Sequence, residues 1–124
     1  MTILTCLLLV AALLPALTAL AAKAGGRGFD NNEPRAWLAH QQGWRARANA
    51  AQANAFEALP FFFAAVLLAL HNGADVMQLA GLAAVWLVLR VTYAGLYMAG
   101  MGTLRSLVWA LAVVVNIIIL FASA

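Results

Sequence analysis

Charged residues are scarce in this chain of 124 residues, of which only 9% are Asp, Glu, Lys or Arg. A soluble globular domain has about 25% charged and roughly 45–50% apolar residues, whereas 66% of this chain is hydrophobic. So few polar side chains would not cover the surface of a water-soluble core. The composition therefore excludes an ordinary soluble domain and predicts an integral membrane protein.

Cysteine and metal-ligating residues are also few. The single cysteine, Cys6, lies in an apolar run and has no partner for an intrachain disulfide. His40 and His71 do not stand at a spacing that metal ligands use, so we predict no metal site. The pI of about 9.8 does not indicate a nucleic-acid partner, because the basic residues flank apolar segments, where they set membrane topology.

Long apolar segments make up most of the chain. Each has close to the ~20 residues with which a helix, at ~1.5 Å per residue, crosses ~30 Å of hydrocarbon. We expect the first to be retained rather than cleaved as a signal peptide, because no positive charge precedes it and its apolar run exceeds the usual ~7–15 residues. The predicted fold class is all-α integral membrane, a single-domain bundle of four transmembrane helices over residues 3–22, 47–70, 76–99 and 104–121.

Positive charge is distributed unevenly between the two sides of this predicted bundle. Basic residues are concentrated between positions 23 and 47, and Arg105 follows the turn after the third helix. No lysine or arginine occurs at the N-terminus, in the turn 71–75 or in the C-terminal tail. The positive-inside rule therefore places the basic side in the cytoplasm, with the N- and C-termini facing away from it.

Polar side chains interrupt the second and third predicted helices and form one stripe on each. At about 100° per residue, the stripes are Arg47, Asn54 and Glu57 on the second helix, and Arg90, Tyr93 and Tyr97 on the third. The rise per residue puts Glu57 and Arg90 at the same depth, ~20 Å from the outer side, so we predict that they form an ion pair.

Ionisable groups inside a membrane segment are functional candidates by default. The structural alternative is a buried ion pair that fixes the helix register, with Asn54 and Asn116 as interhelical hydrogen bonders. For Asn116, alone in the middle of the fourth helix, we favour the structural role. For the two stripes we favour a functional role, because one register lock does not require six such residues.

Two segments carry a resemblance to a known family. RARANAAQANAFEALPFF (45–62) and LRVTYAGLYMAGMGTLRSLVW (89–109) resemble the MAPEG family, the membrane-associated proteins of eicosanoid and glutathione metabolism. The signals are Asn54-x-x-Glu57-x-x-Pro60-Phe61 and Arg90-x-x-Tyr93-x-x-x-Tyr97, with Arg105 opening the next helix. The chain looks like a short bacterial-type member. The resemblance implies a homotrimer among the lipids of the bacterial plasma membrane, with glutathione bound between subunits near the cytoplasmic face.

The resemblance also implies an activity, that of a glutathione transferase or peroxidase whose second substrate is a lipophilic small molecule. It implies that glutathione is the co-substrate and contacts the residues of the two stripes. It assigns catalysis to Arg105, because an arginine at a helix N-terminus favours a thiolate. The alternative for Arg105 is a topological role, as a positive charge at the membrane interface.

A second hypothesis, that the protein is not an enzyme, rests on two alanines, Ala50 and Ala53. Enzymes of the family commonly carry an arginine at the position of Ala50, and some carry another at the position of Ala53. Their replacement favours a non-catalytic membrane protein of the same fold, which binds lipid or a protein partner. A small multidrug exporter has a similar length, but its essential glutamate lies in the first helix and its charge bias is small, so that reading is disfavoured.

Overall fold

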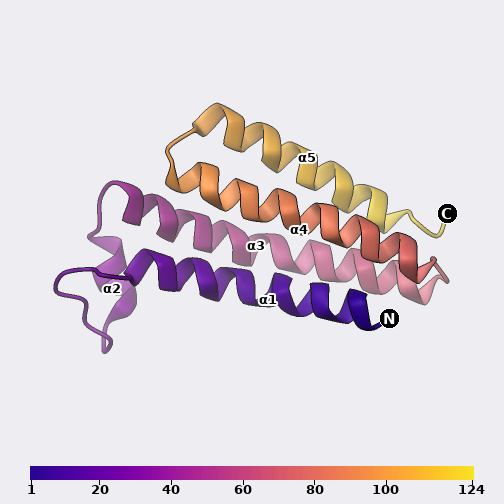
Figure 1. Ribbon diagram of the computed structural model, residues 1–124, viewed down its shortest axis with the longest axis horizontal. Coiled ribbons are helices and arrows are strands. Elements are labelled where there is room, and N and C mark those ends of the chain that lie inside the picture. The colour runs from indigo at the N-terminus through magenta and orange to yellow at the C-terminus, as the bar shows by residue number, and fades with distance from the viewer.

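The structure is a computed structural model that describes residues 1–124, and it is entirely helical (Figure 1). Four of its helices are long and apolar enough to cross a membrane, which confirms the predicted four-span fold class. Their bounds lie close to the predicted ranges. The elements in chain order are α1 (Thr2–Lys23), α2 (Pro34–Ala39), α3 (Trp44–His71), α4 (Val76–Met98) and α5 (Gly102–Leu120).

The short helix α2 lies in the connection between α1 and α3, outside the four predicted membrane helices. Pro34 occupies its first turn, a position at which the missing N–H costs no helical hydrogen bond. The indole N–H of Trp37 donates to the carbonyl of Arg27, at 3.1 Å, and its ring packs edge-on against Phe29. These contacts hold the connection as a folded segment.

The four long helices run antiparallel to their neighbours in the chain (Figure 1). Both termini and the α3–α4 turn lie at one end of the bundle, and α2 and the α4–α5 turn lie at the other. Helix α1 packs against α3 and α4, and α5 packs against the same two helices. The pair α3 and α4 is therefore the centre of the protomer.

The core combines small residues with one aromatic stack. Alanines dominate the buried face of α3, and small residues allow helices to approach closely in a membrane. Phe62 of α3 is fully buried and stacks on Trp86 of α4, with ring centroids 3.8 Å apart and planes 7° apart. This stack is one of the contacts that hold α3 and α4 in their relative rotation.

Two arginines at the start of α3 bind the ends of its neighbours. Arg45 Nη1 donates to the Ala22 carbonyl at 3.0 Å, and Arg47 Nε donates to the Met98 carbonyl at 2.9 Å. Both carbonyls lie in the last turn of a helix, where no intrahelical donor is available. The arginines therefore complete the C-terminal ends of α1 and α4 at the basic end of the bundle.

Candidate functional site

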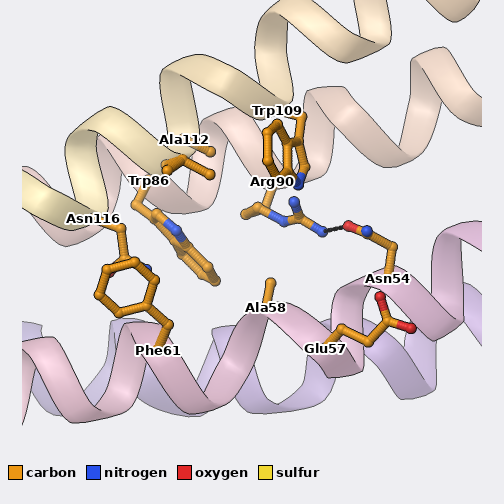
Figure 2. Close-up of a pocket in the computed structure, with 10 residues that line it drawn as sticks. Asn54, Glu57, Ala58, Phe61, Trp86, Arg90, Trp109, Ala112 and Asn116 are labelled. Carbon is orange, nitrogen blue, oxygen red and sulfur yellow. Dashed lines mark hydrogen bonds between the residues drawn. The ribbon is translucent and has the colours of Figure 1, made fainter.

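A groove runs along α3, α4 and α5 and consists of three adjoining pockets. The deep pocket, of about 240 Å³, has a polar side formed by Asn54, Glu57 and Arg90 and continues to Asn116 (Figure 2). The middle pocket, of about 270 Å³, and the end pocket, of about 130 Å³, share Arg105. Because the middle pocket also shares Asn54 with the deep one, the three form one groove.

All seven residues that the sequence analysis singles out line this groove. They are Asn54, Glu57 and Arg90 in the deep pocket, Asn54, Tyr93 and Arg105 in the middle pocket, and Arg47, Tyr97 and Arg105 in the end pocket. The two stripes therefore do converge, and α5 adds Arg105 to them.

Arg90 is the most deeply buried charge of the site, with 3% of its surface exposed. Its Nη2 donates to Asn54 Oδ1, which joins α4 to α3, and its Nε has no hydrogen-bond partner (Figure 2). The guanidinium also lies over the ring of Tyr93, 4.4 Å from the centroid, a favourable cation–π distance. Arg90 is thus held in place, but no carboxylate neutralises it.

The predicted ion pair between Glu57 and Arg90 is wrong. Arg90 binds Asn54 instead, and Glu57 is exposed on the surface of the protomer at the edge of the deep pocket. Glu57 follows Asn54 by three residues, which rotates it by about 60° around α3. Equal depth in the membrane therefore does not bring the two charges together, because their directions around the helix axes differ.

A row of two tyrosines, with an arginine at each end, follows the groove. Arg90 lies over Tyr93, Tyr93 meets Tyr97 edge-on at 5.7 Å, and Arg105 lies over Tyr97 at 4.1 Å. Each guanidinium thus uses one face for an aromatic ring. The N–H groups of Arg105 point sideways from that face and remain suited to bind an anion, whereas Arg90 is almost wholly buried and gives Nη2 to Asn54.

Charge in the groove is unbalanced. Arg47, Arg90 and Arg105 line it together with a single carboxylate, Glu57, so positive charge is in excess. Arg47 uses its Nε for the Met98 carbonyl, and its terminal amino groups remain available in the end pocket. No group of three or more His, Cys, Asp or Glu side chains stands together. The groove therefore has the donors for an anion and not the ligand set for a metal cation.

The predicted interhelical hydrogen bond of Asn116 is also wrong. Asn116 is 4% exposed and its Oδ1 has no hydrogen-bond partner. The amide instead lines the inner part of the deep pocket. Asn54, for which the same structural role was the alternative, does bond across helices, to Arg90.

Two aromatic residues of the groove, Trp86 and Trp109, were not proposed from the sequence, whereas Phe61 ends the motif that begins at Asn54. In an apolar segment an aromatic residue is equally typical of a core or of a lipid-facing surface. One signal was available, because Trp109 and Asn116 are seven residues apart and therefore share a face of α5. A polar residue on the same face as a tryptophan indicates a surface that does not face lipid alone.

The fold and the site together define a class: a multi-pass membrane protein with four spanning helices and an arginine-lined groove inside the bundle. Comparison with protein-family models matches the MAPEG family over residues 1–124, the whole length given. The chain therefore belongs to the MAPEG family. Neither the curated proteins nor the solved structures provide a match.

Proposed function

We propose that the groove binds glutathione and presents its thiolate to a lipophilic electrophile or hydroperoxide. The observation that carries this proposal is the set of three arginines that line the groove without a carboxylate partner. Glutathione brings two carboxylates, which arginine binds through paired N–H groups, and one ammonium. The exposed carboxylate of Glu57 supplies a partner for that ammonium.

Arg105 is the residue that we propose activates the thiol. It lies in the first turn of α5, where its backbone N–H bonds the Met101 carbonyl at 3.0 Å and the positive end of the helix dipole adds to its charge. A free thiol has a pKa near ~8.5, and lowering it by about two units requires about 2.7 kcal/mol. One partly buried guanidinium beside the sulfur is sufficient for a thiolate at neutral pH.

The reaction is a nucleophilic substitution or addition in which the sulfur attacks an electrophilic carbon. The thiol proton passes to water at the basic end of the groove, and the thiolate forms a sulfur–carbon bond with the electrophilic carbon. In a substitution the leaving group departs with the electron pair of its bond. With a hydroperoxide, two glutathione molecules are oxidised to the disulfide while the hydroperoxide is reduced to an alcohol and water.

The lipophilic substrate reaches the thiolate from the membrane. Phe61 of α3 and Trp109 of α5 line the deep pocket and are 41% and 46% exposed at the protomer surface. An apolar molecule dissolved in the lipid therefore meets the pocket between these helices. Polar and apolar substrates enter the same groove from its two ends, as a conjugating enzyme requires.

We also propose that the protein is a homotrimer whose basic end faces the cytoplasm of a bacterial cell. Glu57 is exposed on a single protomer within a membrane-spanning helix. A charge that faces hydrocarbon costs ~2.5–3.5 kcal/mol or more, and a neighbouring subunit that covers Glu57 removes this cost. The number of three comes from the family resemblance, and the orientation from the positive-inside rule.

Purified protein in detergent tests the proposal. Glutathione binding is measured by calorimetry, and conjugation of chlorodinitrobenzene by absorbance, for the wild type and for Arg105→Ala. Arg35→Ala is the matched control, because Arg35 is an exposed arginine outside the groove. We expect Arg105→Ala to bind glutathione but to lose most of its conjugation rate. Equal rates in the wild type and in Arg105→Ala would contradict the role of Arg105.

A non-catalytic protein that binds lipid in the same groove is the second candidate. It is favoured by Ala50 and Ala53, which provide no donor for a carboxylate near the start of α3. Under this alternative the wild type shows no heat of glutathione binding, and native mass spectrometry detects an anionic lipid that Arg90→Leu releases. Glutathione binding in the micromolar to millimolar range excludes it.

A further inference from the structure

The inner part of the deep pocket contains a polar group that the proposed glutathione chemistry does not use. Asn116 lies on α5 seven residues beyond Trp109, and its amide lines this part of the pocket beside Trp86 and Phe61 (Figure 2). The residue is 96% buried, and its Oδ1 accepts no hydrogen bond. The only side-chain hydrogen bond among the pocket residues is the one between Arg90 and Asn54.

A buried amide without a partner is unfavourable, so a bound molecule that pairs with it gains affinity. A trapped water is a poor partner in this position, because it needs two to four polar neighbours. The other side chains that line this part are apolar or aromatic, among them Phe61, Ala112 and Val113. These apolar side chains fit the apolar body of a ligand. The Asn116 amide fits one polar group on that ligand.

We propose that the inner part of the deep pocket holds the apolar portion of the second substrate. Asn116 then binds a hydroxyl group at the end of the substrate that is remote from the reacting carbon. A hydroxyl both donates and accepts a hydrogen bond, so it matches the amide whichever way the oxygen and nitrogen of Asn116 are oriented. The substrate class is thus a lipophilic molecule with a remote hydroxyl group. This inference rests on the proposed function, because it names the chemistry of the acceptor.

The position of the hydroxyl follows from the geometry of α5. Arg105 and Asn116 stand at opposite ends of the joined middle and deep pockets. At ~1.5 Å per residue they are ~16 Å apart along the helix axis. The hydroxyl therefore lies far from the reacting carbon, where it selects and positions the substrate without taking part in the bond change. Asn116 is a specificity-determining residue under this proposal.

The test is a binding measurement without glutathione, so that its result does not depend on any conjugation. The probes are methyl dodecanoate and its ω-hydroxy derivative, which differ by one hydroxyl group. Binding is followed by the fluorescence of the tryptophans, since Trp86 and Trp109 line the pocket, and affinities are corrected for partition into the detergent micelle. The variants are Asn116→Leu and the matched control Ile117→Leu, at the next position of α5, where the side chain is 44% exposed.

We expect the wild type to bind the hydroxylated ester about five- to tenfold more tightly than the parent ester, the range of one hydrogen bond. The preference is expected to vanish in Asn116→Leu and to persist in Ile117→Leu. Asn116→Ala, which leaves the pocket open, is expected to lose the preference as well and replaces the leucine variant should that one not fold.

An equal preference in the wild type and in the Asn116 variants would overturn the proposal, as would a wild type that does not distinguish the two esters. A hydroxyl preference in a protein that fails to bind glutathione overturns the proposed enzymatic function and leaves this subsite standing. Glutathione conjugation by a protein that shows no preference for the hydroxylated ester overturns the subsite and leaves the proposed enzymatic function standing. The two failures are therefore distinguishable.

Discussion

The Arg90–Asn54 hydrogen bond gives the sharpest test of how the site is held together. Arg90 is 3% exposed, and Nη2 to Asn54 Oδ1 is its single hydrogen bond. Asn54→Ala removes the acceptor and leaves the buried guanidinium with only its stacking on Tyr93, at 4.4 Å. A hydrogen bond to a charged group contributes about 1.5–3 kcal/mol. We therefore expect Asn54→Ala to lower the free energy of unfolding by about 2–3 kcal/mol.

A double-mutant cycle isolates this contribution. Unfolding in mixed micelles with increasing dodecyl sulfate is followed by circular dichroism for the wild type, Asn54→Ala, Arg90→Leu and the double variant. Once Arg90 is replaced, no buried charge depends on Asn54, so Asn54→Ala is then expected to cost less than about 1 kcal/mol. The matched control is Asn49→Ala, an asparagine of the same helix outside the groove.

One result would refute this reasoning. An equal loss from Asn54→Ala in the two backgrounds means that Asn54 and Arg90 are not coupled. The stability of α3 against α4 would then come from the alanine-rich contact and the Phe62–Trp86 stack alone.

Three further results are expected from single substitutions. Arg105→Ala should lower the conjugation rate at pH 7 by about 25-fold, because a rise of the thiol pKa from about 6.5 to about 8.5 lowers the thiolate fraction from about 76% to about 3%, whereas Arg105→Lys should retain part of the rate. Asn116→Leu should leave the free energy of unfolding unchanged or raise it by about 1 kcal/mol in dodecyl sulfate titrations, because it removes an unpaired buried amide. A loss of about 2 kcal/mol would show that Asn116 holds helices together. Trp86→Ala should cost about 3–5 kcal/mol in the same titrations, because Trp86 is 2% exposed and stacked on Phe62. Trp109→Ala, at a position 46% exposed, is its control and should cost less than half as much.

The position of polar groups along the helices was predictable, and their pairing was not. Position follows from counting residues at a constant rise, and Glu57 and Arg90 do line the same pocket. Pairing also depends on how each helix is rotated about its axis. That rotation depends on contacts between residues distant in the chain, among them the stacking of Phe62 on Trp86. It turns Asn54 toward Arg90 and leaves Glu57 at the protomer surface.

Asn116 shows the same limit of prediction from sequence, here for a polar residue that pairs with no other side chain. A lone polar residue in an apolar helix indicates that something will pair with it, because hydrocarbon does not. The sequence does not say whether the partner is another helix or a ligand. That distinction depends on the space between α3, α4 and α5. In the structure this space is a pocket beside the Asn116 amide, and no helix pairs with the amide.

Composition and periodicity alone determined that this chain is a four-span membrane protein with two polar stripes, because the length of an apolar run and the angle between residues are local properties of a helix. The segments 45–62 and 89–109 likewise sufficed to indicate the MAPEG family, to which the chain belongs. The tertiary structure decided which polar groups meet, that the arginines lack carboxylate partners, and that Asn116 faces a pocket. These features arise from how whole helices are rotated and spaced against each other. Rotation and spacing depend on packing contacts that are spread over the entire bundle, so no local stretch of sequence determines them.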